Sequence, residues 1–192
     1  MIKKLILLVA ITFSLYANET DAIKTKFKAM AGTIITIVQN KNFTSEVRNN
    51  IIVETITPMF DFQLMAKLSL GKKWKSMDKS KQKEFIELYV QRMKKSYSAK
   101  IDKYTDEEIL INSIKQPKKT RVILNTSLVS AGDRLEVVYK FYKPKKPVLN
   151  KNTWLVYDVV ISGVSIIKTD KAQFSAVLRE SNIDTLMGKL RK

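Results

Sequence analysis

The sequence has no histidine and no cysteine, and only five glycines and four prolines among its 192 residues. Disulfides, thiol nucleophiles, imidazole general bases and Cys or His zinc sites are therefore excluded. No phosphate-binding loop is present, because Gly71 lacks the upstream glycine and the following Ser or Thr of the P-loop pattern. The order Ser-Gly-Val-Ser at residues 162–165 is not that of a nucleophile elbow. Carboxylates, lysines and serines could still perform chemistry, but no motif supports an enzyme, and we expect no enzymatic activity, no catalytic residues, no metal site and no cofactor.

The chain carries a large excess of positive charge, with 35 Lys and Arg against 18 Asp and Glu and a formal net charge of +17. Lys3 and Lys4 belong to a basic start that precedes a short apolar stretch and a region resembling a cleavage site. The apolar stretch is too short to span a bilayer comfortably. We expect residues 1–17 to be a cleaved secretory signal peptide, with an uncleaved anchor as the alternative. Residues 18–192 would then form a single domain, which keeps a charge of +15 after loss of the two lysines.

The positive charge of the expected domain allows three interpretations. Lysines are spread through most segments, which is compatible with an ordinary solvated surface. The charge also suits attraction to anionic lipid headgroups and membrane faces or to acidic partner surfaces, and we expect a partner-docking cluster at Lys143, Lys145 and Lys146. We expect no nucleic-acid binding, because the chain has an export signal and no recognised binding motif.

The spacing of apolar residues changes along the chain and predicts an α+β fold. Residues 19–104 have apolar side chains every three or four positions, as in amphipathic helices. Residues 107–168 have the pattern of strands, and a helical tail follows. The expected strands are 109–114, 120–129, 134–142 and 154–167. The sequence therefore predicts helices packed on an antiparallel sheet of about four strands.

Capping residues mark the expected helix boundaries. Asp61 is expected to start a short helix that Gly71 ends. Asp78 or Ser80 is expected to start a long helix. Asp170, with a Gln three residues later, resembles a capping box for the C-terminal helix.

The segment from Trp154 to Ser165 is almost continuously apolar, unlike the other expected strands. Such a run is typical of a strand covered on both faces. It contains one acid, Asp158, which needs hydrogen-bond donors or water, and we interpret this residue as structural rather than catalytic or headgroup-binding. Gly163 predicts a β-bulge that curves the sheet.

Several residues, taken in order along the chain, carry a family resemblance. They are Asp61-Phe62, Leu70-Gly71, Trp74, Gln82, Phe85, Tyr97, Trp154, Tyr157-Asp158-Val159, Gly163-Val164-Ser165 and Gln173-Phe174. The ordered set resembles the MlaC or toluene-tolerance family of periplasmic phospholipid-binding proteins, over essentially the whole mature chain. Two adjacent positions depart from the family pattern, because Lys171-Ala172 stands where a Tyr-Arg pair is expected.

The resemblance implies a twisted antiparallel sheet and helices that enclose an apolar pocket for phospholipid acyl chains. It also implies a periplasmic carrier that shuttles phospholipid between an outer-membrane lipoprotein complex and an inner-membrane MCE-domain ABC transporter complex. Such a carrier contacts membranes transiently and maintains the lipid asymmetry of the outer membrane. Enclosure is a physical need, since two chains of roughly sixteen carbons cost about 25 kcal/mol to expose to water.

Periodicity does not separate residues that line a pocket from residues that fill a core. The expected lipid-binding residues are Phe62, Met65, Phe85, Tyr89, Met93, Val137, Tyr139, Val156, Ile161, Val164 and Phe174. Aromatic and Met side chains suit an adaptable apolar wall, although they also fill solid cores. The alternative function is therefore an exported basic interaction module with a solid core and no lipid ligand. An exported hydrolase using Ser, Lys or acidic residues is a third possibility without a supporting motif.

Overall fold

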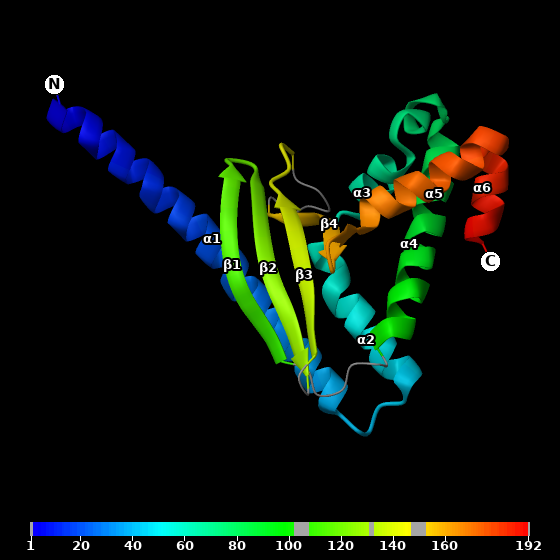
Figure 1. Ribbon diagram of the computed structural model, residues 1–192, viewed down its shortest axis with the longest axis horizontal. Coiled ribbons are helices and arrows are strands. Elements are labelled where there is room, and N and C mark those ends of the chain that lie inside the picture. The colour runs from blue at the N-terminus through cyan, green and yellow to red at the C-terminus, as the bar shows by residue number, and fades with distance from the viewer. Residues whose placement is uncertain (1, 102–107, 131–132, 147–152, 192) are drawn as a thin grey trace.

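The computed structural model describes residues 2–101, 108–130, 133–146 and 153–191. Within these ranges the chain forms six α-helices and one five-stranded antiparallel sheet with the order β1-β2-β3-β4-β5 (Figure 1). The helices are α1 (Ile2–Gln39), α2 (Ser45–Ile56), α3 (Phe62–Leu70), α4 (Lys79–Ile101), α5 (Ile166–Glu180) and α6 (Ile183–Leu190). The strands are β1 (Glu108–Lys118), β2 (Arg121–Ser130), β3 (Asp133–Tyr142), β4 (Leu155–Ile161) and β5 (Val164–Ser165). Two 3₁₀ helices, η1 (Thr57–Met59) and η2 (Gly71–Ser76), flank α3.

One face of the sheet is apolar, and we call it face A. Strand alternation and the antiparallel register put alternate residues of neighbouring strands on the same side, so that Leu124 lies opposite Tyr139 and Tyr139 opposite Val159. Irregularities in β1 and β4 shift the alternation by one residue and keep their apolar side chains on this face. The apolar residues of face A and its central Thr126 are Ile109, Ile111, Ile114, Val122, Leu124, Thr126, Leu128, Leu135, Val137, Tyr139, Phe141, Val156, Val159, Ile161 and Val164. Ser130 and Asp133 lie on the same face at its β2–β3 end.

The apolar residues gather in two clusters. In the first, α1 packs on face A through its buried Ile23, Phe27 and Ala31. The second, which we call the helical cluster, joins α3, η2, α4, α5 and α6, which stand together at the β4 side of the sheet in Figure 1. Phe60 and Ile166 pack against both clusters. The sheet and the helical cluster therefore meet where β4 lies next to the beginnings of α3 and α5.

The expected helix boundaries around α3 and α4 are confirmed. Asp61 accepts a hydrogen bond from the Leu64 N–H at 2.8 Å and caps α3. Gly71 follows α3 with φ 59°, a conformation that suits glycine. Asp78 accepts from the Lys81 N–H at 2.8 Å at the start of α4. These signals are local, so the sequence alone contains them.

The strand expected at residues 154–167 is wrong at its C-terminal end. β4 ends at Ile161, and Ser162 and Gly163 turn the chain with φ 47° and 80° into the two-residue β5. Positive φ at both central residues is the geometry of a tight hairpin turn. Gly163 therefore makes a turn rather than the expected bulge, and the sheet gains a fifth strand. The irregularity in β4 lies instead beside Lys140 and Phe141 of β3.

The capping box expected at Asp170 is also wrong. Ser165 caps α5 by accepting from the Lys168 N–H at 3.2 Å, and the helix is already in its second turn at Asp170. Asp170 is 3% exposed and accepts hydrogen bonds from the Tyr89 hydroxyl at 2.9 Å and from Arg92 at 2.8 Å. Its role is therefore to join α5 to α4.

Candidate functional site

Face A is only partly covered by helices. Near the β1–β2 turn its residues are closely packed, with Val122, Leu124 and Val156 fully buried and Phe141 2% exposed. Seven apolar residues of the same face are only partly buried, and they include those nearest the β2–β3 turn. They are Ile109, Ile111, Ile114, Leu128, Leu135, Tyr139 and Ile161. This side of the sheet therefore presents apolar side chains that the packing of α1 does not fully cover.

A second apolar surface belongs to α2, which packs against α1 and α4. Ile52 and Val53 of this helix are buried, whereas Ile51 and Ile56 are partly buried. Val47 is 44% exposed. Apolar side chains therefore surround much of α2 instead of forming a single stripe, as a helix with contacts on more than one side requires.

The carboxylate of Asp158 is 5% exposed and anchors the β4–β5 hairpin. It accepts a hydrogen bond from Lys140 Nζ at 2.8 Å, from Ser165 Oγ at 2.9 and 3.0 Å, and from the Ile167 N–H at 3.3 Å. These donors come from β3, β5 and the first turn of α5. The structural interpretation of Asp158 is confirmed, because its hydrogen-bonding capacity is used to hold the hairpin and the helix on the sheet.

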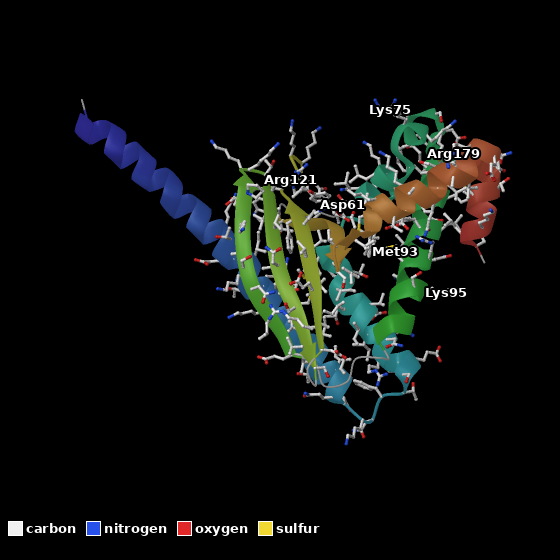
Figure 2. All side chains as sticks on the ribbon, viewed as in Figure 1. Asp61, Lys75, Met93, Lys95, Arg121 and Arg179 are labelled. Atoms are coloured by element: carbon white, nitrogen blue, oxygen red, sulfur yellow. The ribbon has the colours of Figure 1, made fainter. Side chains whose placement is uncertain are left out.

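Asp61 connects the sheet to α3 at the opposite end of β4. Its N–H donates to the Val156 carbonyl at 2.9 Å, and its carboxylate accepts from the Tyr142 hydroxyl. Burial, together with the hydrogen bond to Asp61, raises the pKa of Tyr142 above its usual range. Arg121 lies over the rings of Tyr142 and Tyr157, at 5.6 and 5.2 Å from their centroids. Figure 2 shows Asp61 at the start of α3 and Arg121 at the upper end of β2.

The lysines of the expected docking cluster differ in their surroundings. Lys143 forms an ion pair with Glu19 of α1 and lies 6.0 Å from the centre of the Trp154 ring. Lys145 and Lys146 are exposed. Within the expected docking cluster, Lys145 and Lys146 are therefore the lysines whose side chains are exposed to solvent.

A cavity of about 320 Å³ with a mixed polar and apolar lining lies outside face A, at the far end of the helical cluster. It is lined by Lys73, Ser76, Met77, Asp78, Lys81, Leu178, Ser181, Asn182 and Ile183. Across the residues that the structure describes, no group of three or more acidic side chains could hold a metal ion. In the same part of the chain, no helix combines the length and hydrophobicity needed to cross a bilayer.

Comparison with known proteins decides the family. The profile of the MlaC protein family matches residues 28–192. The chain belongs to the MlaC family. It is 23% identical over 160 residues to the intermembrane phospholipid transport system binding protein MlaC of Haemophilus influenzae, an alignment that covers 81% of this chain and 71% of the relative.

A solved structure has the same fold. It is a phospholipid-binding protein from Ralstonia solanacearum in complex with a phospholipid, and it matches with a TM-score of 0.70 and 19% sequence identity. The match covers 91% of this chain and 99% of the Ralstonia chain. The α+β arrangement of this MlaC family member is therefore that of its structural relative.

The structure divides the eleven expected lipid-binding residues into three groups. Val137, Tyr139, Val156 and Ile161 lie together on face A, as strand alternation predicts. Val164 is 59% exposed on β5 and lies directly opposite Ile161, at the outer edge of face A. The remaining six belong to the helical cluster or pack against it: Phe62, Met65, Phe85, Tyr89, Met93 and Phe174.

The residues of the helical cluster form a closely packed aromatic centre. The Phe174 ring meets Phe85 edge-on at 5.9 Å and Tyr89 at 6.3 Å. Met65, Phe85 and Tyr89 are fully buried. Figure 2 shows Met93 on the same long helix, α4. The partly buried residues that sequence reasoning left out, such as Leu135 and Leu128, are instead on face A, and the alternation of β2 and β3 was the signal that could have found them.

Proposed function

We propose that this chain is a phospholipid carrier that holds acyl chains between face A and the neighbouring helices α1 and α2. The observation that carries the proposal is the set of partly buried apolar side chains on face A. A solid core would bury these side chains fully, whereas a wall that receives a ligand leaves them accessible. The bound phospholipid of the Ralstonia relative, which shares the fold, supports the same conclusion.

The proposed carrier works in the periplasm, between an inner-membrane MCE-domain ABC transporter complex and an outer-membrane lipoprotein complex. Membership of the MlaC family and the name of the Haemophilus relative, an intermembrane phospholipid transport system binding protein, support this route. The N-terminal pattern of a basic start and an apolar stretch supports export. Because the sequence has no nucleotide-binding motif, we assign the energy source to a partner and no enzymatic step to this chain.

The proposed partner-docking residues are Lys145 and Lys146, assisted by Lys143. Exposed lysines act through long-range attraction to acidic surfaces, which accelerates encounter and weakens as salt is added. The ion pair between Lys143 and Glu19 makes Lys143 the weakest contributor of the three.

Lipid extraction tests the carrier function. The exported protein is purified, extracted with organic solvent and analysed by mass spectrometry, and we expect about one phospholipid or more per chain. Stripped protein should also take up phospholipid from vesicles. If the native protein contains no phospholipid and stripped protein takes none up, the alternative of an exported interaction module with a solid core replaces the proposal.

A pair of variants locates the lipid on face A. Ile161→Gln places an amide on face A, and Val160→Gln places the same amide one residue earlier in β4, on the opposite face, at a side chain that is also partly buried. Burying an amide against acyl chains costs about 1–3 kcal/mol, so Ile161→Gln should lower lipid affinity about tenfold while Val160→Gln leaves it unchanged. Equal affinities of the two variants would exclude this part of face A from the site.

A further inference from the structure

Tyr139 places a hydroxyl group inside the apolar wall. The residue lies in the middle of β3, between Leu124 on β2 and Val159 on β4, and its ring meets Phe27 of α1 edge-on at 4.9 Å. These neighbours hold the ring in one orientation through apolar contacts alone. The hydroxyl is thus carried to the same partly buried face on which the proposed acyl chains lie.

The Tyr139 hydroxyl differs from other tyrosine hydroxyls of the core in having no hydrogen-bond partner within the described ranges. Tyr89 donates to Asp170 at 2.9 Å, and Tyr142 donates to Asp61. Tyr139 is only partly buried, so its hydroxyl can reach water in the free protein, and acyl chains that cover face A would remove that water at a cost of about 1–3 kcal/mol. A ligand atom that accepts a hydrogen bond would remove this cost.

The chemistry of face A restricts what that ligand atom can be. Across the described residues of β2, β3 and β4, the strand alternation puts no Lys or Arg on face A, and its one charged side chain there is the acid Asp133 at the β2–β3 end, opposite Ser130. Thr126, which lies nearer to Tyr139, already donates to the Val137 carbonyl at 2.8 Å. A phosphate anion would have no cation beside it on this face, and its desolvation would be unfavourable. Burial raises the pKa of Tyr139 to about 12, so the hydroxyl keeps its proton at neutral pH and acts as a donor. The matching partner is therefore a neutral acceptor.

We propose that Tyr139 recognises the ester linkage of a diacyl phospholipid by donating a hydrogen bond from its hydroxyl to an ester carbonyl oxygen. This inference rests on the proposed carrier function and adds to it the position of the lipid. Ester carbonyls are neutral acceptors at the junction of the acyl chains and the glycerol backbone. With one of them at Tyr139, an acyl chain continues along the apolar side chains of face A while the charged headgroup points away from the face.

The test compares Tyr139→Phe with the wild type on two lipids that differ only in the linkage. One is a diester phosphatidylglycerol, and the other is its diether analogue with the same chains and headgroup, which has no carbonyl. We expect the wild type to bind the diester about five- to tenfold more tightly than the diether, the usual range for one hydrogen bond. Tyr139→Phe should bind both lipids equally, with the affinity that the wild type has for the diether.

Two controls separate recognition from packing. Tyr139→Phe keeps the ring and its contact with Phe27, so its melting temperature should equal or exceed that of the wild type. Tyr142→Phe removes a hydroxyl that is bonded to Asp61, so it should lower the melting temperature and preserve the preference for the diester. Circular dichroism confirms that each variant is folded.

The outcomes that overturn the proposal are distinct. An equal loss of affinity for both lipids in Tyr139→Phe would show a packing role, and an unchanged preference for the diester would show that the hydroxyl does not contact the linkage. If the wild type binds both lipids equally, the ester is not recognised although the carrier function stands. If the wild type binds neither lipid, the carrier function itself fails, and the role of Tyr139 fails with it.

Discussion

Replacement of Asp158 by alanine should destabilise the fold strongly and leave lipid binding intact in the molecules that remain folded. The side chain is 6% exposed and accepts hydrogen bonds from Lys140, Ser165 and Ile167. Its removal leaves the Ser165 hydroxyl and the Ile167 N–H without their acceptor and the Lys140 ammonium without its counter-ion. Breaking a buried ion pair by deletion of one partner costs about 3–5 kcal/mol.

We expect Asp158→Ala to lower the free energy of unfolding by about 4 kcal/mol, the middle of that range, because Lys140 can recover part of its hydration. Its side chain is 27% exposed, so water reaches it when Asp158 is absent. For a domain of 150–250 residues, a change of 1 kcal/mol shifts the melting temperature by about 2–4 °C. The expected shift for Asp158→Ala is therefore a decrease of about 8–16 °C.

Lys140→Met is the matched variant for Asp158→Ala. It removes the counter-ion and leaves the carboxylate bonded to Ser165 and Ile167, so its cost should be about 2 kcal/mol. The free energies of unfolding come from urea titrations followed by circular dichroism, and bound lipid is measured at a temperature where both variants are folded. A loss of less than about 1 kcal/mol for Asp158→Ala, or a loss of lipid without a loss of stability, would refute the structural role of Asp158.

Three further predictions concern the conformation of two glycines, the link made by Asp170 and the exposed lysines. Gly163→Val introduces a β-branched residue at φ 80° and should cost about 1–2 kcal/mol, whereas Gly188→Ala, in α6 with open space around the new methyl group, should stabilise by about 0.5–1 kcal/mol in the same urea titration. Asp170→Ala should cost about 3 kcal/mol, since the 3% exposed carboxylate joins α5 to α4, and a melting curve within 2 °C of the wild type would contradict that. Neutralising Lys145 and Lys146 should slow lipid transfer to partner complexes by about threefold or more at low salt and by little at high salt, with no change in bound lipid. A transfer rate that keeps its salt dependence in the double variant would place the docking surface elsewhere.

The sequence predicts face A well because the side chains of a strand alternate strictly. Val122, Leu124 and Leu128 of β2 fall on one side of the sheet in any model of the strand, and Val137 and Phe141 of β3 face the same way. The caps at Asp61 and Asp78 could also be predicted from the sequence, since each carboxylate accepts a hydrogen bond from an N–H only three residues later.

The sequence could not predict features that depend on contacts between residues far apart in the chain. The helical cluster brings Phe85 against Phe174, and no local pattern states that these rings pack together. The segment from Trp154 to Ser165 contains a turn at Ser162, which has a positive φ. The pattern of apolar residues in this segment does not predict that turn. Sequence periodicity therefore predicts which side of a helix or strand is apolar, but it does not predict which of these apolar sides pack against each other.

Tyr139 shows most clearly what the sequence alone cannot predict. Alternation places it on face A, and its size made it a candidate for lining a lipid pocket. The absence of a partner for its hydroxyl within the described residues depends instead on what surrounds it: Phe27 from α1, Leu124 from β2 and Val159 from β4, all apolar. The same residue type receives an acceptor at Tyr142, because Asp61 lies at the end of the sheet. Recognition of a neutral acceptor is thus a property of the assembled face, and only the fold distinguishes one tyrosine of β3 from the other.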